Sequence, residues 1–182
     1  GLDVWIQVKK KLLYKHVKFQ PYITKYPGHA KEIAWKLTGE MWDTQDILVI
    51  IGGDGTLNEV VNGIQRLSDV TLGYIPTGSG NDFARGLGTP TNPDECLNRI
   101  LNPKRVREID IGRNFIDGKA RRFTISSGIG YAAGICHEAS YSRIKDILNR
   151  LRLGKLTYIC IALRQLATFS PCTIEVLPEN GQ

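Results

Sequence analysis

The sequence has 182 residues, of which 42% are hydrophobic, and its 24 Lys and Arg exceed its 18 Asp and Glu to give a net charge of +6. This length suits one large domain or one domain with part of a second, and the hydrophobic share excludes a disordered chain. The basic surplus favours an anionic partner such as a nucleotide, a nucleic acid or an acidic membrane, although a surplus this small also serves solubility alone.

The four cysteines lie in apolar stretches, at positions 96, 136, 160 and 172, and none forms a C-x-x-C pair. This spacing excludes the usual zinc and thioredoxin-like motifs, and it favours buried thiols in a reducing compartment. No apolar run approaches the roughly 20 residues that span a bilayer, and the first residues do not resemble a signal peptide. A cytoplasmic protein is therefore expected.

Helices and strands are predicted to alternate over the first 103 residues. The run "DILVII" is continuously apolar, as is typical of a parallel strand covered on both faces. Pro21 would place its strand at a sheet edge. The predicted elements are a helix around 5–13, a strand at 17–24, a helix at 27–39, a strand at 46–51, a helix at 56–67, a strand at 70–75 and a helix at 92–101. This order predicts an α/β fold with a parallel sheet.

The pattern changes near residue 105. The stretch 105–112 alternates as a strand, Asp117-Gly118 predicts a turn, and 121–127 returns as a second strand. Helices are predicted at about 140–152 and 155–169, and a strand at 172–177. We therefore predict an α/β nucleotide-binding domain at 1–104 and the beginning of a β-rich domain at 105–182. The missing leading strand, and the turn at Asn180-Gly181 with no return strand, predict a piece of a longer protein.

A glycine-rich loop follows the strand 46–51. It reads Gly52-Gly53-Asp54-Gly55, and a helix is expected to begin at Thr56. Glycine lets the backbone approach a ligand closely, and the free amides of a helix start attract phosphate. The spacing matches neither G-x-x-x-x-G-K-[ST] nor G-x-G-x-x-G, so this loop is a different kind of phosphate site.

A second loop follows the strand 70–75 and contains Gly78 and Gly80, with Asn81 or Asp82 able to cap a short helix. Consecutive parallel strands would bring both loops to the same sheet edge, where open α/β folds bind ligands.

Two interpretations stay open for the polar residues of the first loop. Thr56 and Glu59 match a capping box, so both could serve only their own helix. The Asp54 carboxylate would repel phosphate unless a metal ion or a substrate hydroxyl intervened, which favours a functional role for it.

The stretches "GGDGTLNEVVNGI" and "IPTGSGNDFARGLG" closely resemble the catalytic domain of the diacylglycerol kinase family, whose relatives include sphingosine and ceramide kinases. "IDIGRNFIDGKARRFTISSGIGY" also resembles that family's entry into its second domain. The resemblance implies a phosphofructokinase-like domain, related to NAD kinase, followed by a β-sandwich domain. It implies catalysis by Asp54 and ATP contacts from Thr24, Gly52, Gly53, Asp54, Gly55, Thr56, Leu57, Asn58, Glu59 and Ser79.

The resemblance implies transfer of the γ-phosphoryl group from ATP, with Mg²⁺, to the hydroxyl of diacylglycerol or a related lipid. It also implies that a first strand precedes residue 1, and that a structural magnesium site and a general base follow residue 182. The fragment by itself is therefore expected to be inactive. NAD kinase, which shares the Gly-Gly-Asp-Gly loop, and a non-catalytic nucleotide-binding module remain the alternatives.

The sequence also contains several weaker indications of function. "CHEASY" places Tyr141 where a zinc protease has its second histidine, so His137 is expected to be structural. His29 could line the nucleotide site, although a solvated helix start is favoured. The basic amphipathic stretch 142–155 could contact an anionic membrane, with an ordinary docked helix as the favoured alternative. No nucleic-acid partner is expected, because no aromatic platform accompanies the basic residues. A homodimer is one option for the oligomeric state.

Overall fold

The computed structural model describes residues 1–39, 42–128, 130–131, 133–135, 162–164 and 166. The chain divides into two compact units, residues 1–126 and 127–182. The first unit holds every element described below. In the second, residues 131, 133–135, 162–164 and 166 are helical, and the Tyr131 hydroxyl donates to the Ala162 carbonyl at 2.7 Å. The predicted helix 140–152 and strand 172–177 lie outside the described residues, as does most of the helix 155–169.

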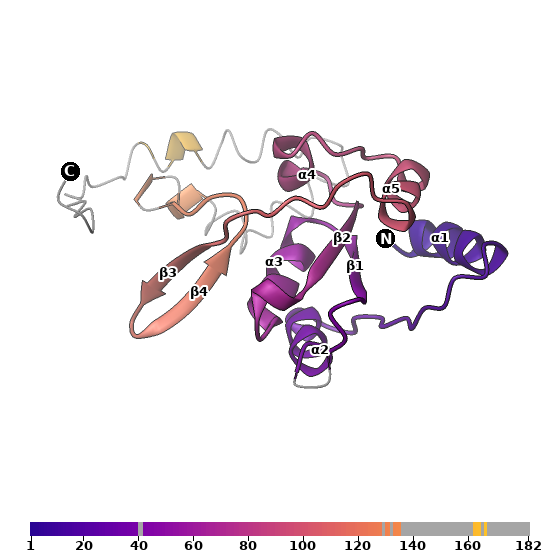
Figure 1. Ribbon diagram of the computed structural model, residues 1–182. Helices are drawn as coiled ribbons and strands as arrows, with labels where there is room; N and C mark the ends of the chain where they lie inside the picture. Colours follow the sequence, from indigo (N-terminus) through magenta and orange to yellow (C-terminus); the bar gives the residue numbers. More distant parts are fainter. Residues whose placement is uncertain (40–41, 129, 132, 136–161, 165, 167–182) are drawn as a thin grey trace. The chain divides into compact units, whose positions relative to one another are not determined.

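The first unit combines helices and strands (Figure 1), but the predicted alternation is incomplete, since helix follows helix at two places. Its elements are α1 (Leu2–Tyr14), α2 (His29–Leu37), β1 (Ile47–Gly52), α3 (Asp54–Gly63), the 3₁₀ turn η1 (Leu67–Asp69), β2 (Thr71–Pro76), α4 (Asp82–Gly86), α5 (Pro93–Leu101), β3 (Gly112–Ile116) and β4 (Lys119–Phe123). The predicted α/β class with a parallel sheet is confirmed, because β1 and β2 pair in parallel from Ile47↔Thr71 to Gly52↔Pro76.

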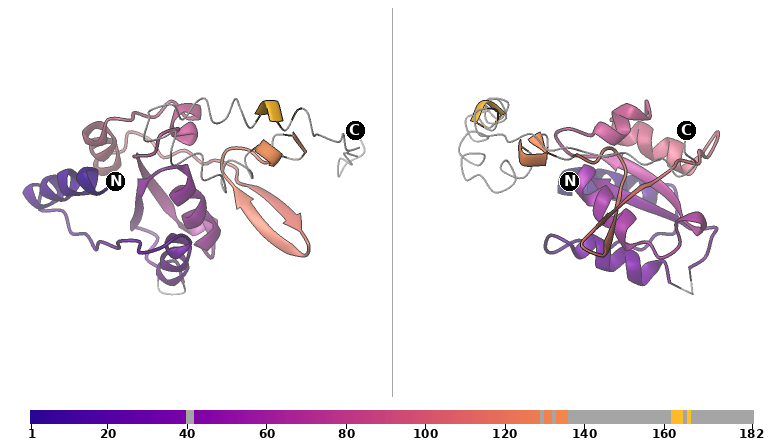
Figure 2. Two further views of the ribbon diagram at one scale, coloured as in Figure 1. Left: turned by 180° about the vertical axis from the view of Figure 1, so that it is seen from behind. Right: turned by 90° about the vertical axis from the view of Figure 1, so that its left-hand side faces the viewer.

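Helices cover both faces of this sheet, as the two views of Figure 2 show. Ile50 faces a cluster formed with α2 and α3, whereas the next residue, Ile51, packs on a cluster formed with α1 and α5. Successive strand residues point to opposite faces, so a strand buried on both faces must be apolar at every position. The first cluster contains Ala30, Ala34, Ile50, Leu57, Val60, Val61 and Ile64, and the second contains Val8, Leu12, Ile75, Cys96 and Leu97.

The predicted strand at 17–24 is wrong. These residues have no regular structure, and the sheets of the described residues are β1–β2 and β3–β4 alone. Val17 and Phe19 pack on the second core cluster, while Tyr22 and Ile23 are exposed. The apolar side chains at Val17 and Phe19 therefore belong to an irregular segment that packs on the core, and no strand of the described residues pairs with its backbone.

The predicted strand at 105–112 is wrong, because residues 105–111 have no regular structure and the first strand of the hairpin is Gly112–Ile116. The second predicted strand, 121–127, overlaps β4. Asp117 and Gly118 form the turn with φ of 50° and 73°, the left-handed values that tight hairpins require. Arg122 joins the hairpin to α3, because its guanidinium donates to the carbonyls of Val61 and Ile64 at 2.8 and 2.6 Å. The domain boundary near residue 105 stays a prediction.

Helix α5 begins as predicted, with the Asn92 side chain accepting from the amides of Asp94 and Glu95 at 2.9 and 3.2 Å. Cys96 is a free, buried thiol, and burial raises its pKa. The other three cysteines lie outside the described residues.

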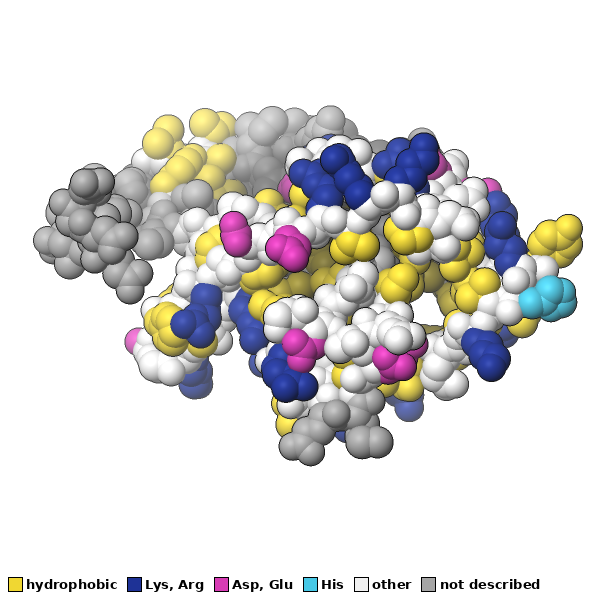
Figure 3. All heavy atoms as spheres, viewed as in Figure 1, with side chains coloured by type: hydrophobic (Ala, Val, Ile, Leu, Met, Phe, Trp, Pro, Cys, Tyr) yellow, Lys and Arg dark blue, Asp and Glu magenta, His cyan; other side chains and the backbone are white. Residues whose placement is uncertain are grey.

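Lys and Arg side chains lie in separate groups on the face drawn in Figure 3, with Asp and Glu between them. No helix among the described residues is both long enough and apolar enough to cross a bilayer.

Candidate functional site

The two predicted glycine loops meet at one edge of the sheet. β1 and β2 end in register at Gly52 and Pro76, so both loops leave at the same level. The amide of Thr77 donates to the carbonyl of Gly52 at 2.8 Å, which continues the strand pairing by one step into the loops. The expectation that parallel strands bring the loops side by side is confirmed.

Two glycines let the loops touch backbone to backbone. A Cβ on Gly78 would lie 2.8 Å from the Cα of Gly53, and a Cβ on Gly53 would lie 3.1 Å from the Cα of Gly78. The second loop is also closed on itself, since the Asn81 side chain accepts from the amide of Gly78 at 2.9 Å and donates to its carbonyl at 2.8 Å. These loops therefore form one unit rather than two separate turns.

Asp54 joins the same two loops through its side chain. Its carboxylate accepts from the amide of Asp82 at 2.9 Å and from that of Phe83 at 3.4 Å. Those amides open α4, whose own N-cap residue, Asn81, makes no side-chain capping bond. A carboxylate at a helix start is favourable because it meets unpaired donors and the positive end of the helix dipole. Asp54 thus caps the helix of the other loop.

Tyr74 stands beside this carboxylate, with its hydroxyl 3.5 Å from Asp54 Oδ1. Burial first, and then the neighbouring negative charge, raise the pKa of Tyr74 to about 12. Its ring also packs edge to face on Phe83 of α4, with the ring centroids 5.8 Å apart. Sequence reasoning missed Tyr74, because within a buried strand it reads simply as one more apolar residue.

The first turn of α3 offers open hydrogen-bond donors. The helix begins at Asp54, two residues earlier than predicted, and its N-cap is Gly53, which has no side chain to accept these amides. Within the described part of the chain, the backbone amides of Asp54, Gly55 and Thr56 have no acceptor. Gly55 is exposed, and a Cβ there would meet nothing within 4 Å. Open amides at a helix start are a suitable site for a phosphate group.

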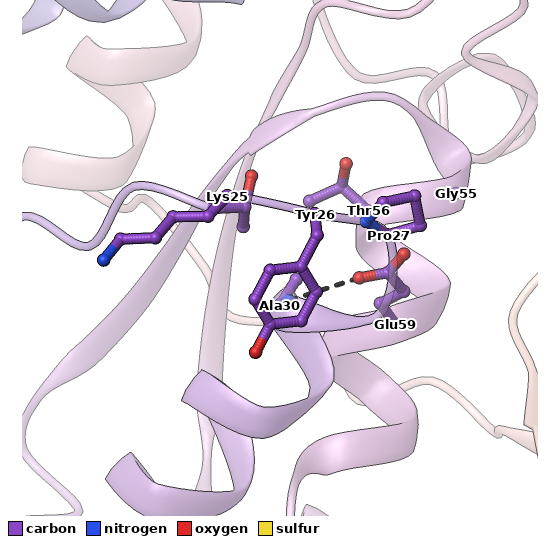
Figure 4. Close-up of a pocket in the computed structure, with 8 residues that line it drawn as sticks. Lys25, Tyr26, Pro27, Ala30, Gly55, Thr56 and Glu59 are labelled. Carbon is purple, nitrogen blue, oxygen red and sulfur yellow. Dashed lines mark hydrogen bonds between the residues drawn. The ribbon is translucent and has the colours of Figure 1, made fainter.

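A pocket of about 470 Å³ lies over this turn (Figure 4). One wall comes from the segment before α2 and the other from α3. The lining residues are Thr24, Lys25, Tyr26, Pro27, Ala30, Gly55, Thr56 and Glu59. Four predicted nucleotide contacts, Thr24, Gly55, Thr56 and Glu59, are therefore brought together. No motif in the sequence pointed to Lys25 and Tyr26, which follow Thr24 directly.

The capping-box interpretation of Thr56 and Glu59 is wrong. Thr56 lies within α3 rather than at its N-cap. The Glu59 carboxylate turns instead to α2, accepting from the amides of Gly28 at 2.9 Å and Ala30 at 3.2 Å. The reason is tertiary, since α2 and α3 pack side by side and α2 has no capping side chain of its own.

The other residues predicted to contact the nucleotide do not line this pocket. Gly52 is buried at the end of β1, and Leu57 is a core residue with 1% of its surface exposed. The Asn58 side chain accepts from Asn62 at 2.7 Å on the side of α3 that meets β4. Ser79 is exposed in the second loop. Their roles toward a nucleotide stay predictions.

His29 is built into the turn before α2. Its Nδ1 accepts from the amide of Lys25 at 3.0 Å, and its ring stacks on Tyr26 with centroids 4.6 Å apart. His29 does not line the pocket, in keeping with the favoured helix-start interpretation. His137 lies outside the described residues.

The chain is similar to lipid kinases over much of its length. Residues 1–114 match the family described as "Diacylglycerol kinase catalytic domain". The protein named "Putative lipid kinase YtlR" of Bacillus subtilis is 32% identical over 99% of this chain and 59% of its own length. "Diacylglycerol kinase" of the same organism is 34% identical over 72% of this chain and 40% of its own. The chain thus spans well under two thirds of these relatives.

A solved structure, "A putative diacylglycerol kinase from Bacillus anthracis str. Sterne", is also similar. It is 23% identical, covers 80% of this chain and 44% of its own, and has a TM-score of 0.45.

Proposed function

Because the chain belongs to the diacylglycerol kinase catalytic-domain family, we propose that its parent protein transfers the γ-phosphoryl group of ATP to a lipid hydroxyl, that of diacylglycerol or a related lipid. The observation that carries the proposal is the pair of glycine loops, which meet where the amides of Asp54, Gly55 and Thr56 are open. Phosphoryl transfer depends mainly on positioning and charge neutralisation, for which such a site is suited.

ATP fits this arrangement. Its phosphates would take the amides at the start of α3, and Thr24 and Thr56 add hydroxyl groups to the same pocket. A pocket of about 470 Å³ is within the usual range for small-molecule sites.

Magnesium fits as an ion that arrives with the nucleotide. The described residues contain no cluster of three or more His, Cys, Asp or Glu that could hold a metal. Asp54 is a single carboxylate already engaged by two amides and by the Tyr74 hydroxyl, which leaves only part of its acceptor capacity for a bound ion or its water. Magnesium would supply charge neutralisation on the phosphates.

The acceptor wall, the general base and a structural metal site are proposed to lie in the part of the parent protein outside this chain. We therefore propose that the 182-residue chain alone binds nucleotide but does not turn over lipid. The parent would act as a cytoplasmic protein at a membrane surface, where its lipid substrate is found.

An acceptor screen with the full-length parent, ATP and Mg²⁺ tests this function. Diacylglycerol in mixed micelles should accept phosphate, and NAD should not. Phosphorylation of NAD alone would assign the parent to the NAD kinases instead. Nucleotide binding without turnover of any acceptor would identify a non-catalytic nucleotide-binding module.

A further inference from the structure

Glu59 lies in the second turn of α3 and faces the pocket that contains Thr24 and Thr56. An ionised carboxylate facing a nucleotide pocket would repel the phosphates if it were free. Both of its oxygens are engaged instead, Oε1 by the amide of Gly28 and Oε2 by that of Ala30. Figure 4 shows the carboxylate directed at the start of α2.

The start of α2 depends on this carboxylate. Its N-cap, Gly28, has a left-handed φ of 90° and no side chain with which to accept the first amides. Glu59 supplies the acceptor from the neighbouring helix, and its charge meets the positive end of the α2 dipole. The two contacts cross 31 and 29 residues of sequence, so they join separate parts of the fold.

The segment held in this way is the wall of the pocket. Gly28 directly follows Lys25, Tyr26 and Pro27, which line the pocket opposite Gly55 and Thr56. Residues 25–29 form a compact turn, because the Lys25 amide bonds to His29 and the Tyr26 ring stacks on it. Anchoring Gly28 therefore anchors the whole turn, and with it the position of Thr24.

We propose that Glu59 is a positioning residue for the nucleotide, which ties the segment 24–28 to α3 so that Thr24 and the open amides of α3 form one site. The inference rests on the proposed function and replaces a direct contact between Glu59 and ATP. The proposal gives different roles to two residues that lie three positions apart on α3. Thr56 faces the ligand, and Glu59 holds the segment 24–28 in place.

The test uses the full-length protein and the variant Glu59→Gln, which keeps one acceptor oxygen but loses the charge and turns an NH₂ group toward a backbone amide. Glu95→Gln is the matched control, because Glu95 is an exposed carboxylate in the first turn of α5 that pairs with Arg99. Glu59→Gln should raise KM for ATP about tenfold, as loss of about 1.4 kcal/mol would. It should change kcat less than about twofold.

Amide hydrogen exchange without nucleotide provides the second readout. In Glu59→Gln the amides of Gly28 and Ala30 should exchange faster than in the wild type, and in Glu95→Gln they should not change. Unaltered exchange at these amides, or a fall in kcat at constant KM, would overturn the positioning role. Hydrogen exchange does not depend on turnover, so it tests the contacts between Glu59 and the start of α2 even if the parent proves not to be a kinase.

A double-mutant cycle with Thr24→Val completes the test. If Glu59 acts through the segment 24–28, Thr24→Val should weaken ATP binding strongly in the wild type and only slightly in Glu59→Gln. Additive losses would instead mean that Glu59 and Thr24 contribute independently, which contradicts the proposal.

Discussion

Asp54 and Glu59 behave alike at the scale of single residues. Each is a carboxylate on α3 that accepts two backbone amides from the start of another helix, Asp54 from α4 and Glu59 from α2. Hydrogen bonds that involve a charged group are the stronger kind, with net values of about 1.5–3 kcal/mol. The two acidic residues of the loop motif therefore organise the surroundings of the open amides, whatever each of them does for a substrate.

We expect Asp54→Asn to lower kcat/KM of the full-length protein at least tenfold while leaving its circular dichroism spectrum unchanged. An asparagine offers one oxygen where two amides need acceptors, so the two loops separate without loss of the core. Asp94→Asn is the control, because Asp94 is a carboxylate of α5 paired with Lys11 at 2.6 Å. Turnover equal to that of the control would show that Asp54 has no part in the reaction.

The raised pKa of Tyr74 predicts that the stability of the protein depends on pH. Its pKa in the folded protein is raised from the ordinary value near 10 to about 12. Its contribution to stability is complete below pH 10 and is lost as the pH rises toward 12, because only the unfolded state ionises at pH 10. Urea unfolding at pH 8 and 11 should show a larger loss for the wild type than for Tyr74→Phe. Equal losses would mean that the phenol titrates normally.

Two glycines of the loops serve different purposes at the scale of the structural element. Gly78 is required by the fold, because any side chain there would strike the backbone of Gly53. Gly55 lies in the first turn of α3, where a side chain would meet open space. The fold does not explain the second glycine, whereas a ligand that approaches the backbone would explain it.

Gly78→Ala should destabilise the protein by about 1–3 kcal/mol, since its Cβ would force the two loops apart. The measurement is the free energy of unfolding from a urea titration of the full-length protein. A change below about 0.5 kcal/mol would show that the loops separate at little cost.

Unlike Gly78→Ala, the variant Gly55→Ala should not lower stability, but it should weaken ATP binding. Alanine is favoured over glycine in a helix by up to about 1 kcal/mol, so the variant should be as stable as the wild type or more so. Its Cβ would occupy the space beside the open amides, and KM for ATP should rise at least about fivefold, which corresponds to about 1 kcal/mol. An unchanged KM would place the phosphates elsewhere.

At the scale of the whole molecule, local sequence patterns predicted several elements correctly and two strands wrongly. The apolar runs of β1 and β2, the Asn92 cap of α5 and the Asp117-Gly118 turn depend on neighbours in sequence, and all are present. The strand predicted at 17–24 was wrong because a strand forms only beside a partner strand. The apolar residues of this segment pack on the core instead. The strand predicted at 105–112 is wrong for the same reason, because β4 pairs with Gly112–Ile116 instead.

The family assignment covers residues 1–114, which include the two glycine loops and the helices that frame them. The chain spans 59% of the length of the relative named YtlR.

The sequence alone determined most of the helices, the strands β1 and β2 and the place of the two glycine loops, because each depends on residues a few positions apart. Together with the family resemblance, it indicated four of the residues that line the pocket, namely Thr24, Gly55, Thr56 and Glu59. Only the tertiary structure decided what the two carboxylates contact. Asp54 reaches amides 28 and 29 residues away, and Glu59 reaches amides 29 and 31 residues away, so their partners exist only once the helices have packed.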